Sequence, residues 1–185
     1  MKQKAKLVTG LIIGFLAAIG LDQWTKLLAV NHLMDRPAYV IWDGVFEFLY
    51  SENRGAAFGM LQGKQWFFLI IAVIVVAAAV YSISRMPATK KYLPLHLIAM
   101  FLSAGAVGNM IDRFTRGYVV DFLYFKLIDF PIFNVADCYV TVSMFIFILL
   151  FLFLYKEEDL NCLSGRKERE AAQDAVPPGV PQSAG

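Results

Sequence analysis

The chain has 185 residues, of which 58% are hydrophobic and 17% are charged, and its mean hydropathy is +0.58. Soluble domains carry about 25% charged and at most about 50% apolar residues, so this composition excludes an ordinary soluble domain and indicates a membrane protein. The formal net charge of +2 comes without a basic stripe or arm, which argues against a nucleic-acid-binding protein.

Four segments suit membrane-spanning helices, which need about 20 mostly apolar residues. The first, residues 7–30, is uncharged as far as Leu21 and is then interrupted by the stretch DQWTK at residues 22–26. Residues 65–84, 92–111 and 138–155 contain no Asp, Glu, Lys or Arg. A signal peptide is a poorer interpretation of the first segment, because no small-residue cleavage site separates it from a soluble domain.

The placement of Lys and Arg predicts the orientation, since basic residues near the ends of spans stay in the cytoplasm. Ten of the 17 precede the first span, lie between the second and third, or follow the fourth. They are Lys2, Lys4, Lys6, Arg85, Lys90, Lys91, Lys156, Arg166, Lys167 and Arg169. Both termini are therefore expected in the cytoplasm, with the longer connections 31–64 and 112–137 outside.

Both outer connections contain residues that favour β-structure. Residues 39–50 are aromatic and β-branched around the turn pair Asp43-Gly44, which predicts a small hairpin or curled sheet. The second connection mixes β-forming residues with Gly117 and Pro131, which indicates a folded excursion at the membrane surface. The predicted fold is an all-α membrane protein with four transmembrane helices and a small extracytoplasmic β-structure.

This membrane unit is expected to occupy residues 1–155 as one domain. The composition becomes polar after Tyr155, so residues 156–185 are expected to form a cytoplasmic tail whose last dozen or so residues are disordered. Gly10 and Gly14 in the first span form a GxxxG pattern, for which a close-packing face and chance are equally good explanations.

Polar residues collect within or near the outer ends of the spans. They are Asp22, Lys26, Asn109, Asp112, Arg113, Asp121, Asn134 and Asp137. One isolated charge in hydrocarbon costs at least ~2.5–3.5 kcal/mol, so several at one depth require pairing, water or a function. Two carboxylates in a low-dielectric site, such as Asp121 and Asp137, share one proton near neutral pH. Such a pair can activate water and protonate a peptide carbonyl without a metal or cofactor.

Other chemistries fit the sequence less well. A zinc site lacks ligands, because the chain has only His32 and His96 and no HExxH motif. A Ser–Lys dyad of Ser51 and Lys26 fits poorly, because nothing in the flanks of Ser51 marks it as a nucleophile. A cysteine mechanism also fits poorly, because Cys138 directly follows Asp137 and the two side chains would point apart on a helix. A proton-coupled membrane transporter subunit remains the main alternative, and a structural or assembly protein the second. A transporter predicts polar residues through the full membrane depth.

Five blocks of sequence occur in an order and spacing typical of one family. They are DQWTK (22–26), ENRGAAFG (52–59), GNMIDR (108–113), GYVVDF (117–122) and FNVAD (133–137). With them the chain resembles lipoprotein signal peptidase, the bacterial signal peptidase II, across roughly residues 7–155.

The resemblance implies an aspartyl endopeptidase that removes the signal peptide from prolipoproteins, before a diacylglyceryl-modified cysteine. It implies Asp121 and Asp137 as the catalytic pair, with four residues that line the site: Asn53, Asn109, Arg113 and Asn134. Asp22 and Lys26 are expected to be structural, because an i, i+4 ion pair lowers the cost of insertion. Asp112 is expected to be an interfacial or cap residue.

The expected setting follows from the same resemblance. The protein would be a multi-pass protein of the bacterial cytoplasmic membrane with its active site near the outer face. Its partners would be the prolipoprotein substrate and the lipid bilayer, without nucleic acid. We expect a monomer that needs no metal or cofactor.

Overall fold

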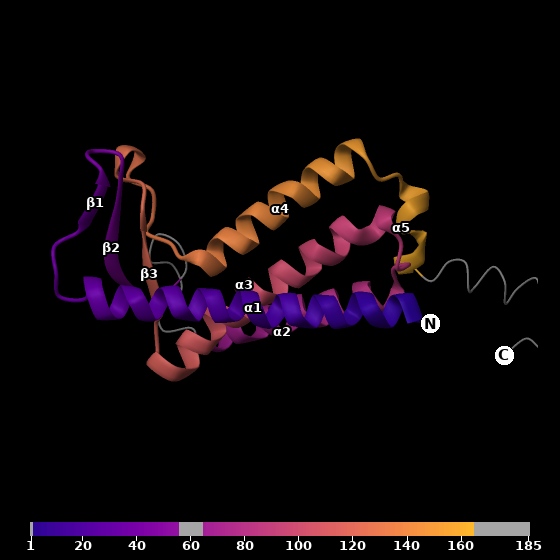
Figure 1. Ribbon diagram of the computed structural model, residues 1–185, viewed down its shortest axis with the longest axis horizontal. Helices are drawn as coiled ribbons and strands as arrows, with labels where there is room; N and C mark the ends of the chain where they lie inside the picture. The colour runs from indigo at the N-terminus through magenta and orange to yellow at the C-terminus, as the bar shows by residue number, and fades with distance from the viewer. Residues whose placement is uncertain (1, 56–64, 165–185) are drawn as a thin grey trace, which may run out of the picture.

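The computed structural model of the protein describes residues 2–55 and 65–164. Residues 56–59, the second half of the ENRGAAFG block, and the predicted disordered end of the tail lie outside these ranges. The helices are α1 Lys2–Leu33, α2 Gln65–Arg85, α3 Leu93–Arg116, α4 Val135–Phe153 and α5 Glu157–Ser164, with short 3-10 turns η2 Lys90–Tyr92 and η3 Lys126–Ile128. The strands are β1 Tyr39–Trp42, β2 Phe46–Asn53 and β3 Val119–Tyr124 (Figure 1).

Among the described residues, four helices are long and apolar enough to cross a membrane, which confirms the prediction of four transmembrane helices. These segments are Lys2–Leu33, Trp66–Arg85, Lys90–Arg116 and Val135–Phe153. The first is one continuous helix, so the charged stretch DQWTK lies inside it. The fourth helix begins three residues before the predicted span, which places Asp137 in its first turn.

Helix α3 is the centre of the bundle and packs against α1, α2 and α4. It has the largest buried share of the four spanning helices. Small residues allow this close packing, because a Cβ atom at Gly105 would lie 2.6 Å from the backbone oxygen of Ala136 on α4. The predicted GxxxG pattern has no such role: nothing lies within 4 Å of a Cβ at Gly10, and Gly14 faces the flexible side chain of Met100.

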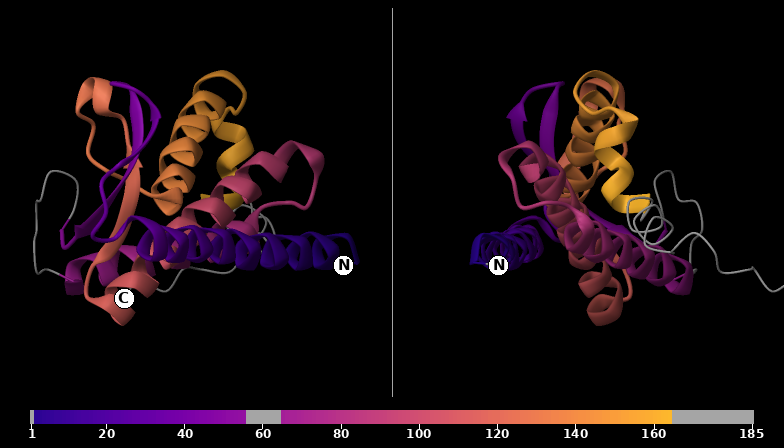
Figure 2. Two further views of the ribbon diagram at one scale, coloured as in Figure 1. Left: turned by 60° about the vertical axis from the view of Figure 1, so that its left-hand side comes forward. Right: turned by 90° about the vertical axis from the view of Figure 1, so that its right-hand side faces the viewer.

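The three strands form one antiparallel sheet in the order β1-β2-β3. Strands β1 and β2 make the predicted hairpin, with Gly44 at a positive φ of 70° in its turn. Strand β3 comes from the second long connection and pairs with β2, Ser51 opposite Asp121 and Asn53 opposite Val119. The sheet lies at one end of the helices and the N-terminus at the other (Figures 1 and 2).

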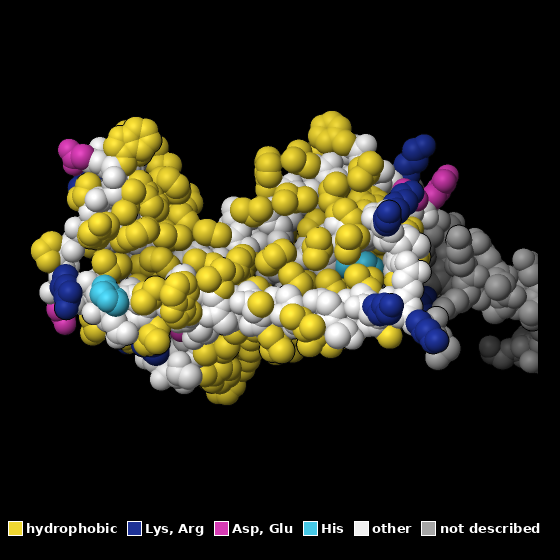
Figure 3. Space-filling model, in the orientation of Figure 1, with side chains coloured by type: hydrophobic (Ala, Val, Ile, Leu, Met, Phe, Trp, Pro, Cys, Tyr) yellow, Lys and Arg dark blue, Asp and Glu magenta, His cyan; other side chains and the backbone are white. Residues whose placement is uncertain are grey.

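The surface between the two ends is mostly apolar. In the space-filling view, Lys and Arg side chains gather near the ends of the long axis, with hydrophobic side chains between them (Figure 3). Exposed apolar side chains of α4 include Phe145, Leu152 and Phe153. This distribution suits helices surrounded by lipid.

Helix α5 closes the end opposite to the sheet. Its backbone carbonyls accept hydrogen bonds from α2, from Tyr81 Oη to Leu163 at 2.9 Å and from Arg85 Nε to Cys162 at 3.4 Å. Lys91 forms an ion pair with Asp159 at 2.6 Å. Part of the predicted tail is therefore a helix that packs on the bundle.

Candidate active site

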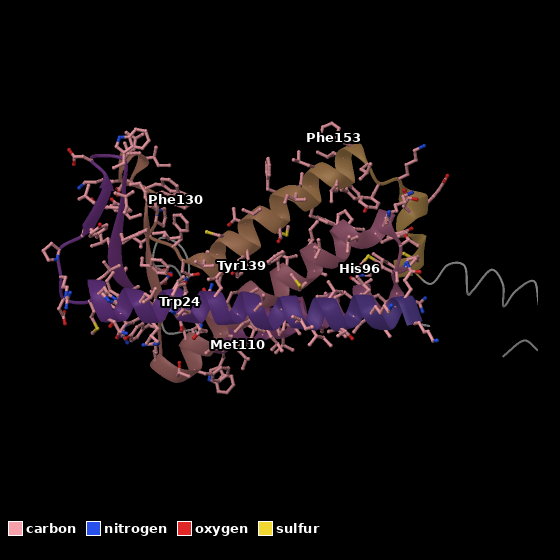
Figure 4. All side chains as sticks on the ribbon, in the orientation of Figure 1. Trp24, His96, Met110, Phe130, Tyr139 and Phe153 are labelled. Carbon is pink, nitrogen blue, oxygen red and sulfur yellow. The ribbon has the colours of Figure 1, made fainter. Side chains whose placement is uncertain are left out.

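A groove of about 920 Å³ opens between the sheet and the first turns of α4. The space-filling view shows the molecule hollowed between these parts (Figure 3), and the stick view places Phe130 beside the sheet and Tyr139 near the start of α4 (Figure 4). One wall is apolar, with Phe125, Ile128, Phe130, Pro131, Ile132 and Phe133, and α4 supplies Cys138, Thr141 and Val142. Five predicted site residues also line the groove: Asn53, Asn109, Arg113, Asp121 and Asp137.

Asp121 lies on β3, where the alternation of a strand would allow every second side chain to face solvent. Its side chain is nevertheless 1% exposed. Asn53 Nδ2 donates to Oδ2 at 2.9 Å and Asn134 Nδ2 donates to Oδ1 at 2.6 Å. Burial, together with the charge of nearby Asp137, raises the pKa of Asp121 to about 7, although the two amide donors act in the opposite direction.

Asp137 is held by the start of its own helix. The backbone N–H of Asp137 donates to Asn134 Oδ1 at 3.0 Å, and the N–H of Asn134 donates to Asp137 Oδ2 at 3.1 Å, which together form a capping box. The other carboxylate oxygen accepts from Asn109 Nδ2 at 2.8 Å. Both oxygens therefore have fixed donors.

Asn134 joins the two carboxylates. Its side-chain amide donates to Asp121 while its backbone donates to Asp137, and Nδ2 also lies 3.1 Å from Asn109 Oδ1. It is fully buried and does not line the groove. Asn134 thus lies behind the pair and keeps the two acids together.

Arg113 lies at the edge of the groove. Its guanidinium donates to the carbonyl of Gly55 at 3.1 Å and lies 4.2 Å from the ring centre of Phe68. Through Gly55, it holds the chain that follows β2, where Asn53 Oδ1 in turn accepts the N–H of Gly55 at 3.0 Å. The cation also favours negative charge on the nearby carboxylates.

Asp22 and Lys26 form the expected ion pair at 2.9 Å with both side chains 0% exposed. Asp112, expected to be an interfacial or cap residue, accepts the backbone N–H of Val120 through Oδ2 at 3.1 Å. Its side chain is also 0% exposed and lies 3.1 Å from Lys26 Nζ. The sequence prediction missed this contact because Lys26 and Asp112 are on different helices. The rule that a buried charge needs a partner of opposite sign could have indicated it.

Among residues 2–55 and 65–164, no group of three or more His, Cys, Asp or Glu side chains is placed to hold a metal ion. The chemistry that these side chains offer is that of two buried carboxylates surrounded by amide donors and one guanidinium. Such an arrangement suits acid and base catalysis at a single bond.

A family model described as signal peptidase (SPase) II matches residues 14–153. The chain belongs to the signal peptidase II family. It is therefore a membrane protease of lipoprotein processing, and this membership decides against the transporter alternative.

Relatives in the signal peptidase II family cover most of the chain. The lipoprotein signal peptidase of Streptococcus thermophilus is 43% identical over 147 residues, which are 80% of this chain and 93% of the relative. That of Caldanaerobacter subterraneus is 47% identical over 127 residues, 68% of this chain and 84% of the relative.

Two solved structures, each described as a bacterial membrane enzyme, are also similar to this protein. One has a TM-score of 0.68 at 31% identity and covers 80% of this chain and 96% of its own. The other has a TM-score of 0.64 at 26% identity and covers 94% and 96%. The chain thus shares its overall fold with these two structures.

Proposed function

We propose that the protein is an aspartyl endopeptidase that cleaves prolipoproteins before the diacylglyceryl-modified cysteine, with Asp121 and Asp137 as its catalytic pair. The observation that carries this proposal is that both carboxylates face one groove and are joined through Asn134. A pKa of about 7 for Asp121 supports a pair that holds one proton at neutral pH.

The reaction follows from that shared proton. The ionised Asp137 takes a proton from water, and the resulting hydroxide attacks the scissile carbonyl carbon while Asp121 donates its proton to the carbonyl oxygen. The tetrahedral intermediate then collapses: Asp121 takes back a proton from one of its two hydroxyl groups, and the leaving amine receives the proton held by Asp137 as the C–N bond breaks. No acyl-enzyme forms, because the nucleophile is water.

The walls of the groove suit a lipid-modified substrate. The aromatic and aliphatic wall that contains Phe130 and Phe133, together with Val142 on α4, offers apolar surface for acyl chains or for the signal peptide. Asn53, Asn109 and Arg113 contribute polar groups to the lining, which can hydrogen-bond an extended substrate backbone. A helical signal peptide has to unwind locally before it can be cut, and these donors offset the lost hydrogen bonds.

We further propose that the sheet and the groove lie at the outer face of the bacterial cytoplasmic membrane. The end opposite to the sheet carries the N-terminal Lys2, Lys4 and Lys6 and the turn with Lys90 and Lys91, which favours a cytoplasmic location. The working form is a monomer, since one chain supplies both aspartates, and it binds no nucleic acid.

The test is cleavage of a diacylglyceryl-modified prolipoprotein peptide by purified protein in detergent, with a chelator present throughout. We expect Asp121→Asn and Asp137→Asn to remain folded and to lose activity by at least about 10³-fold, whereas Asp43→Asn in the exposed hairpin turn is unaffected. Near-full activity of either site variant would overturn the assignment of that aspartate. Loss of wild-type activity with chelator would contradict the metal-free mechanism.

A further inference from the structure

A buried lysine lies directly behind the proposed catalytic pair. Lys26 is 0% exposed, and its ammonium group, with three N–H donors, has three acceptors. Nζ lies 2.9 Å from Asp22 Oδ2 and 3.1 Å from Asp112 Oδ2, and it donates to the side-chain oxygen of Asn109 at 2.8 Å. All three donors are used, so the ammonium group has one favoured arrangement.

This arrangement fixes the orientation of the Asn109 amide. Asn109 Oδ1 accepts from Lys26 Nζ at 2.8 Å and from Asn134 Nδ2 at 3.1 Å. The NH₂ group must then point to the other side, where it donates to Asp137 Oδ1 at 2.8 Å. A flipped amide would place its oxygen against a carboxylate and its NH₂ against the ammonium. A donor aimed at a carboxylate favours the ionised form.

The two carboxylate partners of Lys26 also hold the backbone next to the catalytic pair. Asp22 Oδ1 accepts the N–H of Ala136 at 2.9 Å, and Asp112 Oδ2 accepts the N–H of Val120 at 3.1 Å. Ala136 immediately precedes Asp137, and Val120 immediately precedes Asp121. Through Asp22 and Asp112, Lys26 therefore links α1 and α3 to the backbone of α4 and β3 next to the two proposed catalytic aspartates.

We propose that Lys26 is a positioning residue of the reaction. By orienting Asn109, it keeps Asp137 ionised, so that Asp137 takes the proton from water while Asp121 acts as the acid. This inference rests on the proposed function of the aspartate pair. A purely structural ammonium would use the same three acceptors, so the two roles are separated by the pH profile of the variant.

Charged and titratable groups surround Asp137 and Lys26 from every element that packs there. They are Asp22 on α1, Asp112 and Arg113 on α3, Asp121 on β3, and Cys138 and Tyr139 on α4, with Arg116 at 3.8 Å from Asp112. Replacing Lys26 alone would leave two buried carboxylates without their shared cation, which can prevent folding. The test therefore uses Lys26→Met together with Asp112→Asn, which keeps the net charge of the cluster.

The experiment compares the pH profiles of peptide cleavage by the intact wild-type chain and by the variant Lys26→Met/Asp112→Asn. We expect KM to stay within about twofold, while kcat on the acidic limb falls by up to about tenfold. The acidic limb of the profile should move up by about one pH unit, because that corresponds to a tenfold change in proton affinity. The alkaline limb, which belongs to Asp121, should move up less, because the charge of Lys26 also lowers the pKa of Asp121 but Asn109 donates no hydrogen bond to that carboxylate.

Two controls separate positioning from general damage. Asp112→Asn alone keeps the hydrogen bond from Lys26 to Asn109, so its acidic limb should not move. Lys91→Met removes a lysine ion pair at the other end of the molecule and should leave the whole profile unchanged. If Lys26 acts through Asn109, the paired substitution should cause no additional loss in an Asn109→Ala background.

The outcomes also distinguish this inference from the proposed function. A folded Lys26→Met/Asp112→Asn variant with the wild-type profile, or with an equal loss at every pH, would overturn the role of Lys26 even if both aspartate variants are inert. An active Asp137→Asn variant would overturn the catalytic pair itself. A moved acidic limb together with inert aspartate variants supports both.

Discussion

The two proposed catalytic carboxylates differ in what holds them. Asp121 lies on a strand and receives hydrogen bonds from Asn53 and Asn134, while Asp137 lies in the first turn of α4 and receives them from Asn109 and the backbone of Asn134. Each oxygen of the pair thus has a donor. These donors fix the position of both carboxylates, which is the preorganisation that acid and base catalysis requires.

The raised pKa of Asp121 predicts an alkaline limit of activity. Below a pH of about 7 Asp121 carries a proton, and as the pH rises through that value both carboxylates become ionised and the acid is lost. We expect kcat/KM to fall above about pH 7, by about tenfold per pH unit. The measurement is cleavage of a peptide without groups that titrate between pH 6 and 9.

Thermal melting over the same pH range serves as the control, because unfolding would also lower the rate. A flat profile from pH 6 to 9 with a stable fold would contradict the protonated role of Asp121.

At the scale of elements, the site depends on how closely α3 approaches its neighbours. A Cβ at Gly105 would lie 2.6 Å from the oxygen of Ala136 and 2.8 Å from Val140 Cγ2, and one at Gly108 would lie 2.6 Å from Asp22 Oδ2. Backbone atoms cannot move aside as a flexible side chain can. These glycines therefore allow α3 to contact the start of α4 and the buried carboxylate of α1.

We predict that Gly105→Ala moves α4 away from α3 and displaces Asp137. Overpacking of this kind costs about 1–3 kcal/mol, so the melting temperature should fall by several degrees and kcat should fall with it. Melting and cleavage in detergent would measure both effects.

The matched control is Gly20→Ala on α1, where nothing lies within 4 Å of the added atom. That change should leave activity intact and should not lower the melting temperature, since alanine favours a helix over glycine. Equal behaviour of the two variants would show that the α3–α4 approach does not control the site.

On the scale of the whole molecule, the two ends have separate structural roles. The sheet end contains the groove and its polar residues, and the other end is closed by α5 and an apolar cluster that contains Met86, Leu95, Ile98 and Tyr155. His96 lies toward the α5 end (Figure 4), buried, with its Nε2 3.2 Å from the Pro87 carbonyl oxygen, as expected of a structural histidine.

A chain that ends at Lys156 should therefore keep its catalytic constants. Loss of α5 removes its contacts with Tyr81, Arg85 and Lys91, so we expect a melting temperature lower by about 5 °C but kcat/KM within about twofold of the full chain. Cleavage assays and thermal melting of both chains give the comparison.

Lys91→Met is the control, because it removes only the partly exposed ion pair with Asp159 and should cost less than about 1 kcal/mol. A truncated chain that melts normally but cleaves poorly would mean that α5 affects the distant groove.

Much of the fold could be predicted, because only apolar segments of about 20 residues can cross the lipid bilayer as helices. Uncharged runs of membrane length indicated the spans, and Asp43-Gly44 between β-forming residues indicated the hairpin. The third strand was not predicted, because its pairing with β2 joins residues about 70 positions apart and leaves no local periodic signal.

The site could be predicted in part for the same reason. Asp121 and Asp137 stood out because carboxylates are rare near apolar spans, whereas Asn53 was identified only by the resemblance to the family. The contacts of Lys26 with Asp112 and Asn109 were missed, because a lysine and an aspartate four residues apart already satisfy each other on one helix.

The sequence by itself determined the membrane class, the four spans and the carboxylates that can share a proton, because the cost of burying charge in hydrocarbon leaves few alternatives. Only the tertiary structure decided that Asn134 joins the two acids and that Lys26 reaches Asp137 through Asn109. Those contacts depend on how α1, α3, β3 and α4 pack at one point, and hydrogen bonds between separate elements require distances that sequence spacing does not specify.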